Sequence, residues 1–139
     1  MNVTQAETAG VELSTTANIV PGKLSGTVAY TYLYSLNLAS GVPLSRRPAN
    51  TGTLALTYTG IENLAATLSA TFVGTRYNDT AATLLLPAYT RVDLSTSYRL
   101  NDSVTVFGRI ENLFNARYTD PYGYNTAGFS VYAGLTLSH

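Results

Sequence analysis

The sequence contains no cysteine and no tryptophan, and it has a single histidine, His139, and a single lysine, Lys23. Without cysteine there can be no disulfide, no thiolate metal site and no cysteine nucleophile. Eight basic and eight acidic residues give a formal charge of zero, so the basic surface of a nucleic-acid-binding protein is absent. We therefore expect no nucleic-acid partner.

Long apolar runs are also missing, because no stretch approaches the ~18 continuous apolar residues that a membrane-spanning helix requires. Residues 1–7 have neither a basic segment nor an apolar segment, so they do not resemble a secretory signal, and we expect the true start of an exported protein to lie upstream. The 139 residues suffice for one domain. The 11 Tyr and the many Thr, Ser, Ala, Leu and Gly residues favour strands, so we predict an all-β chain.

Most of the chain alternates with a period of two. In residues 24–36 one face carries Val28 and three tyrosines, Tyr30, Tyr32 and Tyr34, while the other carries mainly hydroxyl side chains. The same division recurs in residues 91–100 and 129–138. It predicts seven strands with the following ranges: 7–19, 24–36, 51–59, 64–77, 89–100, 104–114 and 129–138.

The predicted connections alternate in length. They are short at residues 20–23, 60–63 and 101–103, and long at 37–50, 78–88 and 115–128. Short periplasmic turns and long extracellular loops are typical of outer-membrane β-barrels, so we predict an antiparallel transmembrane β-barrel segment whose last strand runs toward the periplasm.

The apolar face is expected to contact outer-membrane lipid, with tyrosines near the strand ends as an aromatic girdle. The residues predicted to face lipid are Val28, Tyr30, Tyr32, Tyr34, Leu94, Tyr98, Val106, Leu135 and Leu137. A soluble sandwich or small barrel is the alternative, but several strands exceed the ~5–6 residues that are usual in soluble proteins. They match instead the ~9–11 residues that cross a bilayer at a tilt.

One segment near the C-terminus resembles the C-terminal signature of the TonB-dependent receptors. Its matching residues are Asn112, Leu113, Phe114, Tyr118, Gly123, Tyr124 and Gly128. The resemblance implies an N-terminal plug inside a barrel of about 22 strands, of which residues 1–139 would be the C-terminal portion, without the plug. It also implies transport rather than catalysis, and contact with TonB only through the absent plug. Residues 43–48 and 122–128 are most similar to the cobalamin receptors of the family, and a ferric siderophore receptor is the alternative.

Five charged residues are predicted to face the lumen: Arg91, Asp93, Arg99, Arg109 and Glu111. Antiparallel pairing could bring Asp93 near Arg109 and Arg91 near Glu111. Such residues could contact the plug or a passing polar ligand, or they could form a solvated charge ladder on a wet wall. In a long loop, Arg46 and Arg47 could attract an anionic chelate or be solvated.

No catalytic, cofactor-binding or metal-binding residue is predicted. His139 with Asp93 or Asp120 would lack a group to orient the imidazole. Asp79 and Asp120 lie in separate loops without the spacing of a calcium loop, and residues 125–128 are interpreted as a turn. An outer-membrane barrel enzyme and a soluble ligand-binding barrel remain alternatives from other classes.

Closure of the seven predicted strands on themselves is not expected. An odd number of antiparallel strands makes the first and last strands parallel, and the resulting pore would be too narrow for the charged face. We predict a curved open sheet that is completed by missing strands or by other copies. His139 occupies the terminal position at which the resembling family has an aromatic residue, and this departure could weaken recognition by the barrel-assembly machinery.

Overall fold

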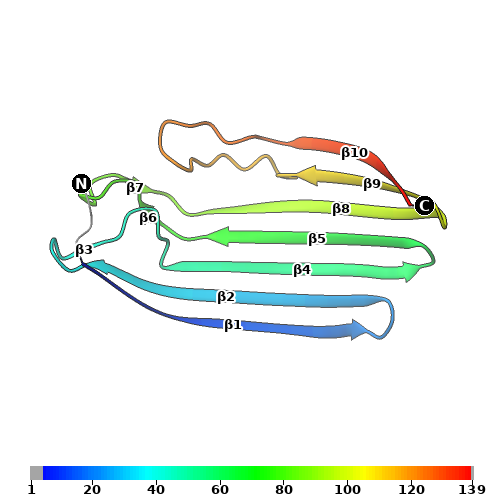
Figure 1. The fold of residues 1–139 in the computed structure, drawn as a ribbon, viewed down its shortest axis with the longest axis horizontal. Coiled ribbons are helices and arrows are strands. Elements are labelled where there is room, and N and C mark those ends of the chain that lie inside the picture. Colours follow the sequence, from blue (N-terminus) through cyan, green and yellow to red (C-terminus); the bar gives the residue numbers. More distant parts are fainter. Residues whose placement is uncertain (1–4, 139) are drawn as a thin grey trace.

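The structure, a computed structural model, describes residues 5–138. These residues form one large curved sheet, with a small two-stranded ribbon at one end (Figure 1). The strands of the sheet are β1 (Ala6–Val20), β2 (Leu24–Asn37), β3 (Val42–Pro43), β4 (Asn50–Ile61), β5 (Leu64–Val73), β8 (Tyr89–Asn101), β9 (Val104–Glu111) and β10 (Ser130–Leu137). The ribbon pairs β6 (Arg76–Tyr77) with β7 (Leu85–Leu86).

The main sheet has the order β1-β2-β4-β5-β8-β9-β10, and β3 pairs only with β2. Each neighbouring pair is antiparallel, so the chain forms a simple meander. The three short connections lie at one end of the sheet and the three long connections at the other (Figure 1). We call these the short-turn end and the long-loop end. The predicted all-β antiparallel architecture is confirmed.

Strand register keeps the two sets of side chains apart across the whole sheet. Val28 pairs with Leu54, Leu68 with Leu94, and Val106 with Leu135, so apolar residues form one continuous face. On the other face, hydroxyl side chains meet, and Thr16 and Thr57 hydrogen-bond to Thr27 and Thr67, respectively, at 3.0 Å. We call these the apolar face and the polar face.

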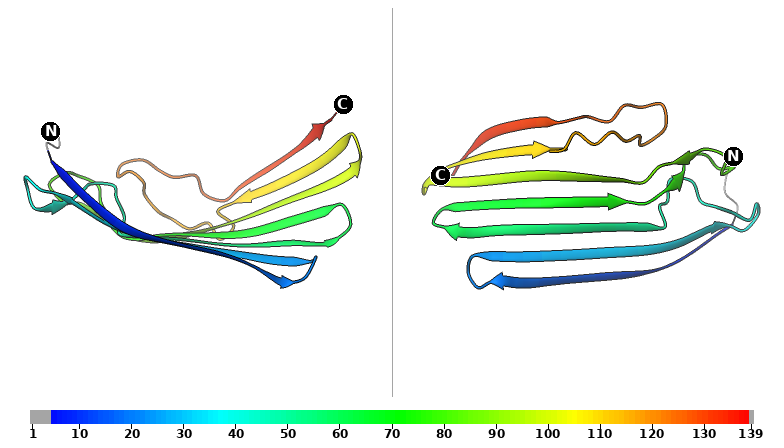
Figure 2. Two further views of the ribbon diagram at one scale, coloured as in Figure 1. Left: turned by 60° about the horizontal axis from the view of Figure 1, so that its bottom comes forward. Right: turned by 180° about the vertical axis from the view of Figure 1, so that it is seen from behind.

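The apolar face of the sheet is the more exposed one, whereas in a soluble protein the apolar face would be buried. In β2 the residues Val28, Tyr30, Tyr32 and Tyr34 are exposed, whereas the alternate residues are less accessible: Ala29, Thr31 and Leu33 are half-buried, and Ser35 is buried. The sheet is strongly curved (Figure 2), and hollows in its surface open on the polar face, around Ser95, Ser97 and Arg109 among others. The polar face is therefore the concave one.

No second layer covers the apolar face of the described sheet. Among residues 5–138 the only fully buried hydrophobic side chain is Leu86, in the small ribbon. A soluble sandwich would bury its apolar face against another sheet. That alternative is therefore wrong for this fold. The same residues form no helix, and so none that could cross a membrane.

The predicted strand ranges agree with the structure in their middle parts and differ at the long-loop end. β5 ends at Val73, where the Gly74 N–H bonds to the Asn50 carbonyl oxygen at 2.8 Å. Arg76 and Tyr77 then pair with β7 instead of continuing β5 as predicted. β9 ends at Glu111 instead of residue 114, because Asn112 adopts a positive φ of 53°.

The first and last strands have only one neighbour each. β1 pairs with β2, β10 pairs with β9, and within the described chain no ladder joins β1 to β10. The two strands lie at opposite edges of the sheet (Figure 2). The predicted open sheet is confirmed.

Two aromatic side chains of β9 and β10 interrupt the polar face. Phe107 lies over Gly134 of β10, where an added Cβ atom would collide with the phenyl ring. Tyr132, also on β10, lies beneath the guanidinium group of Arg109, with 4.9 Å between Arg109 Cζ and the ring centroid. Glycine at 134 therefore allows the Phe107 ring to lie flat against the neighbouring strand.

Candidate functional site at the long-loop end

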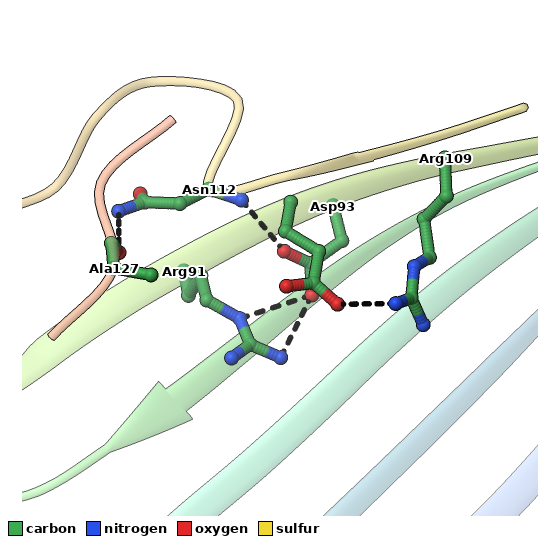
Figure 3. A network of polar contacts seen from close by, with 6 residues as sticks. Arg91, Asp93, Arg109, Asn112 and Ala127 are labelled. Carbon is green, nitrogen blue, oxygen red and sulfur yellow. Dashed lines mark hydrogen bonds and ion pairs between the residues drawn. The ribbon is translucent and has the colours of Figure 1, made fainter. Parts of the chain in front are cut away.

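Charged side chains of the polar face gather where β8 and β9 approach the long loops (Figure 3). Arg91 donates from Nε to Asp93 Oδ2 at 3.0 Å, and its Nη2 atom lies 3.0 Å from the same oxygen. The other carboxylate oxygen of Asp93 accepts the backbone N–H of Asn112 at 2.9 Å. Asp93 therefore connects a cation on its own strand to the end of β9.

The predicted ion pairs between β8 and β9 are wrong. Arg91 pairs with Asp93, and Arg109 pairs with Glu111 at 3.1 Å, so both pairs run along a strand. The reason is register: a bulge between Arg99 and Asn101 shifts the ladder, so that Ser95 is opposite Arg109. Asp93 is then nearest in register to Glu111, and each arginine pairs instead with the carboxylate two residues away on its own strand.

Asn112 is the first residue of the motif that resembles the TonB-dependent receptors, and its side chain connects segments of the following loop. Its side chain is 1 % exposed, and it bonds to both backbone groups of Ala116, donating to the carbonyl at 3.0 Å and accepting the N–H at 2.7 Å. It also donates to the Ala127 carbonyl at 3.3 Å (Figure 3). One amide thus holds both arms of the 112–129 loop together.

Asn115 and Gly128 form a second connection in this loop. Asn115 Oδ1 accepts the N–H of Phe129 at 3.1 Å, and an added Cβ atom on Gly128 would lie 2.6 Å from that oxygen. The glycine of the motif is therefore required by close approach. Gly123 adopts a positive φ of 86° in the turn that precedes Tyr124, whose N–H bonds to the Pro121 carbonyl. The turn lies there and not at residues 125–128, where it was predicted.

The other motif residues differ in exposure. Tyr118 stacks on Tyr89 of β8, with ring centroids 3.9 Å apart. Leu113 is half-buried, and its N–H bonds to the Val92 carbonyl at 2.7 Å, whereas the side chains of Phe114 and Tyr124 are exposed. Asn112, Leu113 and Tyr118 therefore attach the loop to β8.

Arg76 is the buried cation of this end, and its side chain is 2 % exposed. Its Nη2 atom lies 3.1 Å from both the Thr119 carbonyl oxygen and Asp120 Oδ2. Its guanidinium carbon lies 5.4 Å from the centre of the Tyr89 ring. The burial of Arg76 was not predicted, because it depends on a loop that is distant in the sequence.

Of the other two long loops, the 78–88 loop is stabilised by local contacts of Asp79, and the 37–50 loop carries two arginines. Asp79 accepts hydrogen bonds from Thr83 and from the Leu84 N–H, and these bonds, led by the one from Leu84, lower the pKa of Asp79 from 3.8 to about 2. Arg46 and Arg47 are both exposed, and Arg47 lines a hollow with Leu44, Ser45 and Thr80. The first arginine has a positive φ of 58°.

The remaining predicted site residues lie away from this cluster. Arg99 lies at the short-turn end, where it donates to Asn63 Oδ1 from Nε at 3.1 Å and from Nη2 at 2.8 Å.

The residues predicted to face lipid lie on the apolar face, and all are exposed except Leu94, which was expected to be exposed. Leu94 is half-buried between its cross-strand partners Leu68 and Ile110. Tyr58 and Tyr98 lie toward the short turns, while Tyr30, Tyr32 and Tyr34 lie in the half of β2 that leads to the long loops.

The two aspartates considered for a hydrolytic site have other partners. Asp93 is bonded to Arg91 and Asn112, and Asp120 is paired with Arg76. His139 lies outside the described residues. Within the described part of the chain, no group of three or more His, Asp and Glu side chains is placed to hold a metal ion.

Comparison with known proteins identifies the family. The model for "TonB dependent receptor-like, beta-barrel" matches residues 1–113. This chain belongs to that family. The match ends just after Asn112, so it is independent of most of the motif at residues 112–128. The vitamin B12 transporter BtuB of Photobacterium profundum is a relative with 38% identity over 136 residues, which cover 98% of this chain and 22% of the relative.

Solved structures of two receptors share the fold of the chain. The siderophore receptor PiuA from Acinetobacter baumannii superposes with a TM-score of 0.71 at 26% identity, over 94% of this chain and 22% of PiuA. A mutant of the ferric enterobactin receptor PfeA from Pseudomonas aeruginosa superposes with a TM-score of 0.84 at 24% identity, over 99% of this chain and 23% of PfeA. The chain thus spans less than a quarter of these relatives. The family consists of transport receptors, not enzymes.

Proposed function

We propose that this chain forms part of the wall of an outer-membrane receptor that takes up cobalamin by TonB-dependent transport. The observation that carries the proposal is the 38% identity to a vitamin B12 transporter over nearly the whole chain. In this proposal residues 1–139 supply the last seven strands of a larger barrel. The plug, the other strands and the contact with TonB through the plug belong to the remainder of the receptor.

The distribution of exposed residues supports the location in the outer membrane. A sheet that exposes Leu135 and Val28 to 62% and 48% on its apolar face, while its polar face is concave, fits a wall with lipid outside and water inside. The residues that were predicted to face lipid then contact the bilayer. Arg91, Asp93, Arg99, Arg109 and Glu111 face the lumen, and the long loops lie on the extracellular side.

A ferric siderophore receptor is the second candidate, and a specific observation favours it. PiuA, a siderophore receptor, shares 26% identity with this chain over a similar length. The lower identity places this candidate behind cobalamin. Both candidates use the same fold, so the structure of the wall alone does not favour one over the other.

Equilibrium binding to the full-length receptor in detergent would test the two candidates. We expect saturable binding of cyanocobalamin and no competition by a ferric catecholate. Uptake of labelled cyanocobalamin should then depend on TonB in cells that express the full-length protein. Binding of the ferric catecholate without binding of cyanocobalamin would contradict the proposal and favour the second candidate.

A further inference from the structure

Residues 76–78 comprise β6 and the residue that follows it. They contact all three long loops, and we call them the loop junction. The Tyr77 carbonyl accepts the N–H of Arg46, which lies in the 37–50 loop. Arg76 and Tyr77 pair with β7, which closes the 78–88 loop. Asn78 accepts the N–H of Tyr122 at 3.1 Å, and Arg76 bonds to Thr119 and Asp120, so the 115–128 loop is held as well.

The charged group of the loop junction is the Arg76 guanidinium, and its partners lie in the 115–128 loop. Arg76 is 2 % exposed, and among the described residues the only carboxylate within ion-pair distance is that of Asp120, which is itself 39 % exposed. The Arg76 Nη1 atom has no hydrogen-bond partner in the same part of the chain. If the 115–128 loop moved away alone, a buried guanidinium would lose both its carboxylate and the Thr119 carbonyl. An uncompensated buried charge is strongly unfavourable, so the movement of this loop must be accompanied by movement of Arg76.

Arg76 cannot move without disturbing the other loops. Its backbone is paired with Leu86, whose side chain is 1 % exposed, and the next residue holds the N–H of Arg46. The guanidinium also lies over Tyr89, which stacks on Tyr118 of the moving loop. The three loops are therefore mechanically connected through the loop junction, in which Arg76 is the residue that holds the 115–128 loop.

We propose that Arg76 is a positioning residue that couples the three long loops, so that a ligand held by one loop also orders the other two. The proposal rests on the proposed function, because it takes the long loops as the ligand-facing side of a transport receptor. Arg76 itself is too deeply buried to contact a ligand. Its role is to make the closing of the loops cooperative.

Hydrogen exchange in the full-length receptor, without ligand, tests the coupling directly. In Arg76→Gln and in Asp120→Asn we expect about tenfold faster amide exchange in all three long loops, at residues 38–49, 78–86 and 116–128, with β2, β4 and β5 unchanged. The double variant should exchange no faster than Arg76→Gln, because both changes break one contact. Arg99→Gln is the matched control, since it removes an arginine that joins two segments at the short-turn end.

Ligand release provides a second readout that a purely local role would leave unchanged. Cyanocobalamin should dissociate about tenfold faster from Asp120→Asn and from Arg76→Lys than from the wild type or Arg99→Gln. Faster exchange in residues 116–128 alone would overturn the coupling, as would uniformly faster exchange in all strands. A wild-type receptor that binds no cyanocobalamin would count against the proposed function only, because the exchange result stands without ligand.

Discussion

Asn112 shows how a single amide can take the place of several backbone hydrogen bonds. Asn112 is the first residue after β9, where the backbone hydrogen bonds of the ladder end. The side chain satisfies Ala116 and Ala127, and the backbone N–H is satisfied by Asp93. A shorter or apolar side chain could not replace these contacts, because buried backbone groups need partners.

Replacement of Asn112 by alanine is expected to lower the free energy of unfolding of the full-length receptor by about 2–4 kcal/mol, because a buried amide and its hydrogen bonds to the backbone of Ala116 and Ala127 are lost. Asn112→Gly should cost somewhat less, since glycine adopts the positive φ of 53° without strain. Urea unfolding in detergent measures both. Asn125→Ala, at an exposed position in the same loop, is the control, and an equal effect there would contradict the assignment.

The Asp79 carboxylate provides a prediction about pH. Because its pKa is lowered from 3.8 to about 2, the ionised form stabilises the 79–84 turn. This contribution is complete above pH 3.8 and is lost as the pH falls through about 2. A titration of the ¹³C-labelled carboxyl group by NMR should therefore report a pKa near 2, and a value at or above 3.8 would show that the hydrogen bonds to Thr83 and Leu84 are not formed in solution.

At the scale of strands, the alternation of side chains decides which face meets which solvent. Val28 and Thr27 are neighbours in β2, yet they lie on opposite faces, with Val28 opposite Leu54 and Thr27 opposite Ala55. Their exposures also differ in the sense expected for a barrel wall. Adjacent substitutions can therefore test the two faces at the same depth in the bilayer.

Val28→Arg is expected to destabilise the folded receptor in lipid by ~2–4 kcal/mol, whereas Thr27→Arg should have a mild effect. The physical reason is that the first guanidinium would face hydrocarbon and the second would face water. Reversible unfolding in lipid vesicles measures the difference. Leu135→Arg and Ser95→Arg form a second matched pair on other strands, and equal damage at both members of a pair would contradict the assignment of faces.

The long strands could be predicted from sequence because their period of two extends over most of their length. The short strands β3, β6 and β7 could not, because two residues do not establish a period. The register between β8 and β9 was wrong because it depends on a bulge near Arg99, which leaves no clear mark in the sequence. The pairs Arg91–Asp93 and Arg109–Glu111 were visible as opposite charges two residues apart on one face.

The burial of Arg76 and the role of Asn112 lay beyond sequence reasoning for a different reason. Both depend on where the 112–129 loop lies, and that position results from many irregular contacts instead of a repeating pattern. The motif residues were identified by resemblance, but their physical tasks become evident only in the structure. Gly128 is an example, since its requirement comes from the Asn115 side chain.

At the scale of the whole molecule, the described residues are a wall with two open edges. Each unpaired strand edge in a bilayer leaves backbone groups without partners, and each such group costs several kcal/mol. We therefore expect residues 1–139 expressed alone to support no energy-dependent uptake of cyanocobalamin, whereas the full-length receptor supports it. The test is uptake of labelled cyanocobalamin in cells that lack other cobalamin receptors. Accumulation in cells that express only residues 1–139 would contradict the proposal that uptake requires the remainder of the receptor.

The strands of the sheet also differ in length. β1 has 15 residues and β4 has 12, but β9 and β10 have only 8 each. At roughly 3.3 Å per residue and a tilt near 45°, eight residues span about 19 Å, compared with a hydrocarbon thickness of about 30 Å. In the bilayer setting proposed above, the hydrophobic mismatch would be greatest beside β9 and β10, and the lipid there would be thinned. A change in bilayer thickness would then alter the lipid mismatch most strongly beside β9 and β10, next to the 112–129 loop that joins them.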